Sequence, residues 1–309
     1  MSLLTPSQGG PLEEAANWFA ELAADEVDPA TERAWERWLQ ADSRHAVAWA
    51  RVEEISARFS GLPPSGRMAL ARRESLGRRR ALKVLGLALG GLALGWTRPD
   101  DWRLGQGPAL STAVGEIRAF DLAAGVRVWL NTDSQLAQAT ANHWRLLRGE
   151  ALFESRGGSA PTVLEATAGR VRFGVGCCAV RARDHGLEVA AYSGALQLLP
   201  RQARPETLAE GRQALLTPTA VQPLGRVDPG RQLWRQGRLV VDDWSLAALV
   251  AELGRYRPGL LTCTATVAPL RVVGSYPLAD TDRALAALAD SLPVRVERRL
   301  PWWVQIVPA

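Results

Sequence analysis

The residues that could do chemistry in this chain are few, and their spacing matches no familiar catalytic or metal site. The cysteines are Cys177, Cys178 and Cys263, and the histidines are His45, His143 and His185. No CxxC or HExxH motif groups them as metal ligands, and no GxSxG motif marks a serine nucleophile. An odd number of cysteines leaves at least one thiol unpaired. The sequence therefore predicts no metal, no cofactor and no conventional enzymatic site.

Charge is distributed unevenly along the 309 residues. The formal net charge is +5, yet residues 11–58 carry eleven acidic residues against five arginines, a local net charge of about −6. With 47% hydrophobic and 22% charged residues, the chain can bury real cores and does not have the composition of a disordered protein. No basic helix interleaved with aromatic residues accompanies the downstream positive charge, so direct nucleic-acid binding is not expected.

The middle of the chain has the pattern of a membrane signal. From Ala81 to Thr97 the only charged residue is Lys83, and these 17 residues would form a helix about 25 Å long, the short end of what crosses a bilayer. Arginines precede this run, and positive charge stays on the cytoplasmic side. The prediction is a transmembrane helix over residues 81–97 with the N-terminus in the cytoplasm. The alternative is a buried helix of a soluble core.

A basic linker over residues 61–80 is expected before this helix. The residues predicted to act as the export or topology signal are Arg78, Arg79, Arg80 and Lys83. They lie in GRRRALK, which resembles the twin-arginine export consensus that a receptor reads. The following run contains GLALG twice. This is either the small-residue spacing that lets helices dimerise or simply a weakly hydrophobic segment.

Residues 11–59 are predicted to form three short helices. Apolar residues recur at helical spacing, and DPATERAWERWLQAD opens with Asp28 as the N-cap and Pro29 at the first helical position. Four of the twelve tryptophans fall in this segment. Some of them must fill its core, but so small a unit cannot bury four indoles fully. One or two are therefore expected on a surface that binds a partner.

The stretch from AANWFAEL to AWARVEEI resembles the N-terminal cytoplasmic domain of the FecR family, transmembrane regulators of extracytoplasmic-function (ECF) sigma factors. The resemblance implies that residues 1–60 hold a sigma factor at the inner membrane. A segment of net charge about −6 would complement the basic DNA-binding surfaces of sigma factors. The residues expected to bind the sigma factor are Trp18, Trp35, Trp38, Leu39, His45 and Trp49.

Residues 98–227 are predicted to form an all-β periplasmic domain. Short alternating runs such as VRVWL and RVRFGV are separated by Gly, Asn and Asp, as in antiparallel sheets. The region resembles the FecR β domain along its length. The residues that carry this resemblance are Gly115, Leu122, Gly125, Leu130, Asn131 and Ser134.

One departure from the family pattern could matter chemically. Cys177 follows Gly176 where the family has a threonine, and some members are described as cutting themselves at that Gly–Thr bond by an acyl shift onto the hydroxyl. An ionised thiol is the better nucleophile, so an N-to-S shift makes Gly176–Cys177 a candidate self-cleavage site. The alternative is two small residues packed in a strand with their side chains on opposite faces.

Residues 228–309 are predicted to form a periplasmic α+β unit of the split βαβ type. A strand followed by a helix occurs twice, and WWVQIV forms a last strand. The run from Trp234 to Tyr256 resembles the short N-terminal (STN) domain shared by secretins and TonB-dependent outer-membrane receptors. The resemblance implies that the signalling domain of such a receptor binds within residues 231–309. Strand addition at an open sheet edge is a reasonable mode of contact.

The predicted fold class is multidomain: an all-α three-helix domain, one transmembrane helix, an all-β FecR domain and an α+β domain. The resemblance implies a single-pass anti-sigma factor of the bacterial inner membrane, with its C-terminus in the periplasm. It would relay a signal from a TonB-dependent receptor to an ECF sigma factor and control iron or siderophore uptake genes. Proteases would release the sigma factor. The alternatives are a structural periplasmic assembly module and a membrane-anchored hydrolase.

Overall fold

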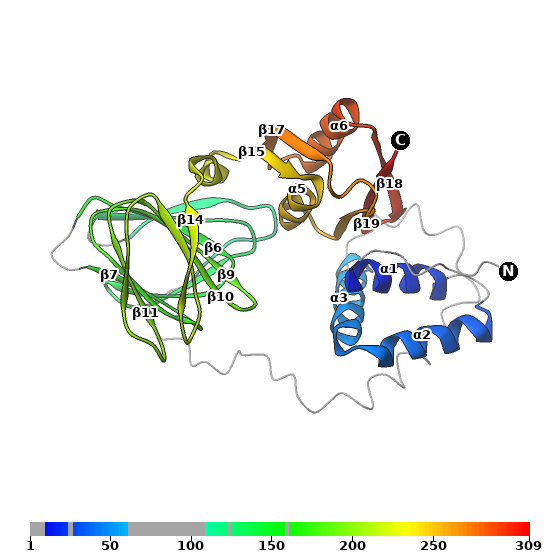
Figure 1. Ribbon diagram of the computed structural model, residues 1–309, viewed down its shortest axis with the longest axis horizontal. Coiled ribbons are helices and arrows are strands. Elements are labelled where there is room, and N and C mark those ends of the chain that lie inside the picture. The colour runs from blue at the N-terminus through cyan, green and yellow to red at the C-terminus, as the bar shows by residue number, and fades with distance from the viewer. Residues whose placement is uncertain (1–9, 24–26, 61–108, 123–124, 158–160) are drawn as a thin grey trace.

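The fold was analysed in a computed structural model that describes residues 10–23, 27–60, 109–122, 125–157 and 161–309. Three regions follow one another along the chain: a helical region, a domain of two large sheets, and a small unit of helices and strands at the C-terminus (Figure 1). The C-terminal unit contacts both of the other regions.

The helical region consists of three helices. They are α1 (Pro11–Leu22), α2 (Pro29–Ala41) and α3 (Ser43–Ser60). Helix α2 begins as its sequence predicts, because the Asp28 carboxylate accepts a hydrogen bond of 2.9 Å from the Ala30 amide and Pro29 follows the cap. The apolar faces of the helices meet around Ala15, Ala16 and Val52, none of which is exposed to solvent.

The middle domain is a sandwich of two seven-stranded sheets. The first sheet has the order β1 (Ala109–Ser111), β4 (Gln135–Thr140), β5 (His143–Arg148), β7 (Thr162–Ala166), β8 (Gly169–Phe173), β11 (Leu196–Pro200) and β12 (Glu206–Leu208). The second has the order β14 (Val221–Arg226), β13 (Arg212–Leu216), β10 (Gly186–Ser193), β9 (Gly176–Arg183), β6 (Glu150–Ser155), β3 (Val126–Leu130) and β2 (Arg118–Asp121). All neighbouring strands are antiparallel except β5 and β7.

The core of this domain lies between the two sheets. Strand β3 alternates buried and more exposed positions, as does β8, so every second side chain points inward. Leu130, Phe153 and Leu198 are completely buried there. The outer face of the second sheet is also partly buried, since Leu152 belongs to the core of the C-terminal unit instead. Sheet and unit are thus packed together.

The C-terminal unit contains two helices between two small sheets. Its helical segments are the 3₁₀ segment η4 (Pro229–Gln236), α5 (Leu246–Leu253), the short 3₁₀ turn η5 (Gly254–Tyr256) and α6 (Thr281–Ser291). Its strands are β15 (Arg238–Ser245), β16 (Leu260–Cys263), β17 (Arg271–Pro277), β18 (Val294–Leu300) and β19 (Trp303–Pro308). Strands β15 and β17 form one antiparallel pair, while β19 lies between β16 and β18. Ser245 and Asp280 cap α5 and α6 by accepting amide hydrogen bonds.

The predicted fold class needs a correction. It included a transmembrane helix, but no helix in the described part of the chain is both long enough and apolar enough to cross a membrane. The segment predicted to span the membrane, residues 81–97, lies outside the described residues, as does the linker 61–80 with Arg78, Arg79, Arg80 and Lys83. The fold is therefore a helical region, a mostly β domain and a small α+β unit.

Candidate functional site

The structure separates the six residues predicted to bind a sigma factor into two groups. Trp35 and Trp49 are buried, with 8% and 9% of their surface exposed, and their rings pack 5.0 Å apart in the helical core. The side chains that remain partly accessible are Trp18, Trp38, Leu39 and His45. Only this second group can touch a partner without opening the helices.

Trp38 and His45 form a small polar arrangement at the edge of that core. Their rings are stacked 4.4 Å apart at an angle of 7°. The Trp38 indole donates a 2.6 Å hydrogen bond to the Glu14 carboxylate, and His45 Nδ1 lies 2.6 Å from the Trp38 carbonyl oxygen. Because that carbonyl can only accept, Nδ1 carries the proton. His45 Nε2 lies 3.9 Å from Glu14 and completes the group.

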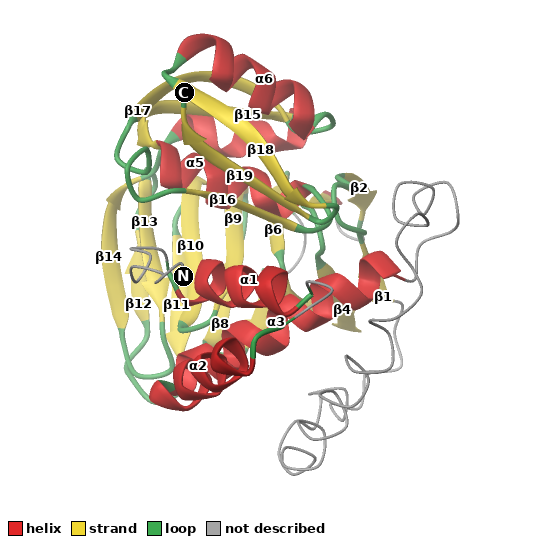
Figure 2. Cartoon of the chain, turned by 90° about the vertical axis from the view of Figure 1, so that its right-hand side faces the viewer, coloured by secondary structure: helices red, strands yellow, loops and turns green. Residues whose placement is uncertain are grey.

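The helical region packs against the C-terminal unit through aromatic side chains. Trp302, 6% exposed, lies edge-on to Phe19 with ring centroids 5.4 Å apart. Leu260 and Trp303 belong to the same buried cluster. At its border the Gln305 amide donates a 2.7 Å hydrogen bond to Glu13. Figure 2 shows this contact, with β16 and β19 lying above α1 and α3. It can form only where both regions share a compartment.

The β domain meets the C-terminal unit through buried ion pairs. Arg255 lies 2.8 Å from Glu150 of β6 and 2.5 Å from Glu252 of α5. Arg181 of β9 lies 2.8 Å from the same Glu252. These four side chains are between 8% and 18% exposed. We call this set the ionic junction: two carboxylates and two guanidiniums from both sides of the interface, held together where water has little access.

Neutral hydrogen bonds complete the ionic junction. The Asn131 amide donates to the Tyr256 hydroxyl at 2.7 Å and to Glu150 at 3.0 Å. The Thr132 hydroxyl donates to the Arg255 carbonyl oxygen at 2.9 Å. A buried charge is tolerated when such partners satisfy its hydrogen-bonding capacity. The Asn–Thr pair at the end of β3 thus fixes the orientation of the charged side chains.

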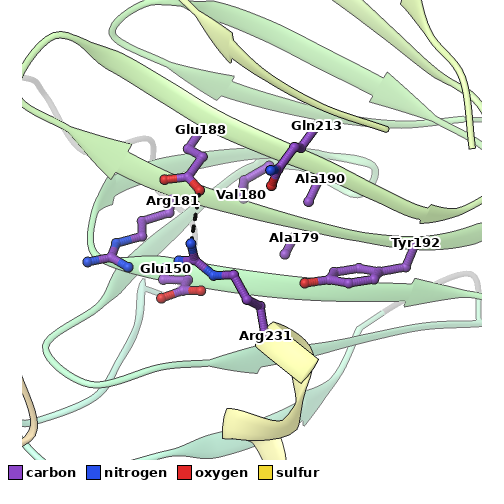
Figure 3. Close-up of a pocket in the computed structure, with 9 residues that line it drawn as sticks. All are labelled: Glu150, Ala179, Val180, Arg181, Glu188, Ala190, Tyr192, Gln213 and Arg231. Carbon is purple, nitrogen blue, oxygen red and sulfur yellow. Dashed lines mark ion pairs between the residues drawn. The ribbon is translucent and has the colours of Figure 1, made fainter. Parts of the chain in front are cut away.

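A cavity lies beside the ionic junction, on the outer face of the second sheet (Figure 3). Arg231 of η4 reaches over the sheet and lies 3.6 Å from Glu188, and Tyr192 and Gln213 also line the space. Its volume is about 20 Å³, which is room for one water molecule and not for a metabolite. The cavity is therefore part of the interface between regions and not a small-molecule site.

The electrostatics of the ionic junction favour the charged state of Glu252. Burial alone would raise the pKa of this carboxyl group, but the guanidiniums of Arg255 and Arg181 outweigh burial and lower its pKa to about 2. Burial raises the pKa of Tyr256 well above its ordinary value, so the hydroxyl keeps its proton while it accepts from Asn131. Glu252 therefore stays charged and paired near neutral pH.

The Gly176–Cys177 bond lies at the start of β9. Gly176 has a φ of +138°, and a Cβ atom there would come within 2.2 Å of the Ser193 carbonyl oxygen, so only glycine fits. The Cys177 amide donates a 2.9 Å hydrogen bond to the Ser193 hydroxyl. Burial raises the pKa of the Cys177 thiol, which disfavours the thiolate. Cys178 points to the other face and is 1% exposed. The geometry favours the packing interpretation of this pair.

Metal chemistry finds no support in the described residues. No group of three or more His, Cys, Asp or Glu side chains there could hold a metal ion. His143 Nε2 lies 3.4 Å from Glu165, which Arg145 contacts at 3.2 Å, so this histidine lies beside an arginine–glutamate ion pair on the first sheet.

Comparisons with known proteins match two of these regions to families. Residues 109–197 match the family described as FecR protein, and residues 13–55 match a domain of unknown function, DUF4880. Two crystal structures of a "putative anti-sigma factor" from Parabacteroides distasonis have a similar fold, with TM-scores of 0.53 and 0.52 at 16% and 17% identity. Each covers 65% of this chain and 99% of its own. No curated protein matches. Within this chain, the segment similar to DUF4880 thus precedes the segment similar to the FecR family.

Sequence reasoning missed the ionic junction, although its residues had drawn attention. Glu252, Arg255 and Tyr256 were part of the pattern that resembles the STN domain, and Asn131 was part of the FecR pattern. The sequence offered one signal of the junction: Glu252 stands at an otherwise apolar helix end, and Arg255 follows it three residues later. The sequence could not show that both side chains face a second domain.

Proposed function

We propose that this protein is an anti-sigma factor whose helical region binds an ECF sigma factor. The observation that carries the proposal is the order of the chain: an acidic helical segment that matches DUF4880 precedes a FecR domain. The fold neighbours from Parabacteroides distasonis, described as an anti-sigma factor, support the same class. The charge of about −6 over residues 11–58, from eleven acids and five arginines, suits a basic partner.

We assign the contact to the accessible side of the helices. Trp18, Trp38 and His45 are partly exposed and offer aromatic anchors of the kind that dominate protein interfaces. Trp35 and Trp49 act indirectly by holding the helices together. On α2 the exposed Glu32 and Glu36 supply negative charge that would steer the sigma factor.

Co-purification of the full chain with a co-encoded ECF sigma factor tests the proposal. The variant Glu32→Lys/Glu36→Lys should weaken binding at least tenfold and reduce its salt dependence, because it reverses charge on the exposed face. Glu206→Lys, an exposed position of β12 in the β domain, is the matched control and should bind normally. Failure of the wild-type chain to retain any sigma factor would exclude the anti-sigma function.

The periplasmic half of the proposal concerns the C-terminal unit. It holds that this unit binds the signalling domain of a TonB-dependent outer-membrane receptor and that iron or siderophore uptake genes are controlled. Its support is the resemblance of the run from Trp234 to Tyr256 to STN domains. Proteolytic release of the sigma factor is part of the same proposal. A pulse-chase blot that shows only full-length protein under inducing conditions would remove the proteolytic step.

The proposed location is the bacterial inner membrane, and the aromatic contact makes it testable. Glu13 and Gln305 are hydrogen bonded, so Glu13→Cys/Gln305→Cys in a chain without Cys177 and Cys263 should be joined by a short bismaleimide in purified protein. The same cross-link in intact cells would place helices and C-terminal unit in one compartment and would overturn the split topology of this proposal. A cross-link that forms only after detergent extraction would place them on opposite sides of the membrane.

Self-cleavage at Gly176–Cys177 is a separate, untested hypothesis, and the alternative that the pair simply packs in the strand predicts an uncut chain. The missing side chain of Gly176 leaves its carbonyl carbon unhindered and favours cleavage, whereas the raised pKa of the Cys177 thiol opposes it. Purified wild-type protein incubated at pH 8 with hydroxylamine should then remain intact on a denaturing gel, as should Cys177→Ala. Two fragments from the wild type and none from the variant would instead establish the N-to-S shift.

A further inference from the structure

The surface of the C-terminal unit that faces away from both neighbouring regions has an unpaired strand edge. Strand β17 pairs with β15 and with no other strand of the described chain. Its second edge therefore offers backbone N–H and C=O groups in a row, which is the template for strand addition. Figure 1 shows β17 and α6 at the top of the molecule, away from α1 and α3.

A groove lies at the end of this strand, between β17 and α6. Its volume is about 350 Å³, and it is lined by Arg238 of β15, by Ser275, Tyr276 and Pro277 of β17, and by Arg283 and Ala287 of α6. The wall is apolar where Tyr276, Pro277 and Ala287 stand, and polar at Ser275, to whose hydroxyl Arg238 donates a 3.1 Å hydrogen bond. The groove is large enough for one side chain of a bound peptide and the residues on either side of it.

The groove carries positive charge without compensation. Within the described residues no carboxylate forms an ion pair with Arg238 or Arg283, while other arginines of this unit, such as Arg257, Arg271 and Arg298, are paired with aspartates. Two exposed guanidiniums that converge on one space attract a carboxylate, since Arg presents donors in the geometry that a carboxylate accepts.

An exposed apolar side chain lies farther along the same strand face. Val273 is 69% exposed, the most exposed of the large hydrophobic side chains in the described chain. It precedes Ser275 by two residues, so both point to the outer face of the β15–β17 pair, roughly 7 Å apart. The edge of β17 thus has arginines near Ser275 and an apolar side chain at Val273. This asymmetry favours one orientation of a bound strand, with an acidic side chain near the arginines and an apolar one at Val273.

We propose that the β17 edge and this groove bind an extended acidic segment of a partner protein, which adds a third strand to the β15–β17 pair. An acidic side chain of the segment pairs with Arg238 and Arg283. An apolar side chain two positions away covers Val273, as alternation along a strand requires. The inference deepens the proposed function and rests on it only for the identity of the partner, the periplasmic signalling domain of the receptor.

Two arms of one binding experiment test the site and the partner separately. In the first, a fluorescein-labelled peptide TSETVTS, whose glutamate lies two positions before its valine, is titrated with the full chain and followed by anisotropy, with TSKTVTS as the matched basic peptide. Only the acidic peptide should bind saturably. Arg238→Glu/Arg283→Glu and Val273→Ser should each weaken binding, the charge reversal at least tenfold, while Arg226→Glu on exposed β14 should not. Equal binding of both peptides, or none by the acidic one, would overturn the site.

In the second arm the purified signalling domain of the co-encoded receptor replaces the peptide. Tenfold weaker binding by the groove variants, with normal binding by Arg226→Glu, supports the site as the receptor contact. A receptor domain that binds all variants equally overturns that contact. A receptor domain that does not bind the wild type removes the receptor from the proposed function, while the peptide arm still decides whether the groove takes acidic segments.

Discussion

The C-terminal unit meets its two neighbours by different chemistry, because only its contact with the β domain adds buried ion pairs to apolar packing. Toward the helices it presents Trp302 and Leu260, and a single hydrogen bond from Gln305 lies at the border. Toward the β domain it presents Glu252 and Arg255, which are paired with buried charges of that domain. One unit thus carries an apolar contact on one face and, on another, an apolar contact around Leu152 that also holds buried ion pairs.

The two contacts differ in how much rotation of one region against the other each of them tolerates. An apolar contact is non-directional and roughly proportional to buried area, so it survives small rotations of one region on the other. Buried charges are stable only when each finds its partner in good geometry. The ionic junction therefore fixes the orientation of the C-terminal unit on the β domain, whereas the aromatic contact holds the helices without demanding one register.

The largest effect is expected from breaking the ionic junction. Glu252→Ala leaves Arg181 and Arg255 buried without their shared carboxylate, so the free energy of unfolding of the C-terminal unit should fall by about 3–5 kcal/mol. Hydrogen exchange of the backbone amides in α5 and β9 measures this loss of stability separately on each side of the junction. Glu54→Ala, whose ion pairs are exposed, is the matched control. A loss below about 1 kcal/mol would show that water reaches these charges.

A somewhat smaller effect is expected from breaking the aromatic contact. Trp302→Ala removes a nearly buried ring and its edge-on partner contact with Phe19, which should cost about 3 kcal/mol and speed hydrogen exchange in α1 and α3. The rate in β9 should not change. Trp144→Ala empties the β-domain core instead, and should leave α1 unaffected. Fast exchange in β9 after Trp302→Ala would contradict the independence of the two contacts.

Lowering the pH should stabilise the helical contact and destabilise the ionic junction. Burial raises the pKa of Glu13 above its ordinary 4.5, despite the hydrogen bond from Gln305, so this charge opposes the helical contact above that pKa and the opposition vanishes as pH falls to 4.5. The pKa of Glu252 is lowered from 4.5 to about 2, so its contribution is complete above 4.5 and is lost as pH falls toward 2.

Acidification from pH 7 to 4.5 should therefore slow exchange in α1, and acidification from 4.5 to 2 should speed it in α5, after correction for intrinsic rates. Glu13→Gln should abolish the first change and Glu252→Gln the second. A single transition shared by both helices would mean that the contacts open together.

Much of the fold was predictable because its patterns are local. The cap at Asp28 and the alternation in VRVWL each depend on residues a few positions apart, and the helices and strands lie where these patterns predict. The transmembrane helix was predicted from an apolar run preceded by arginines; residues 81–97 lie outside the described residues, and no helix within the described part is long and apolar enough to cross a membrane. Hydropathy cannot tell whether a short apolar run with two GLALG repeats crosses a bilayer or packs elsewhere.

The candidate sites were harder to predict because they join distant residues. Arg255 and Glu150 are 105 positions apart, and Gln305 and Glu13 are 292 apart. No periodicity relates such pairs. The sequence predicted that some of the four tryptophans fill the helical core, but it could not divide them into buried Trp35 and Trp49 and the more accessible Trp18 and Trp38.

The smallest effect is expected from ion pairs that share the chemistry of the ionic junction but not its burial. On α3, Glu54 lies 2.6 Å from Arg51 and also contacts Arg58, and these side chains are 45–60% exposed. Arg58→Ala should change the free energy of α3 opening by less than about 0.5 kcal/mol, and 0.5 M salt should remove even that. An effect near that of Glu252→Ala would mean that geometry, and not exclusion of water, makes the buried pairs strong.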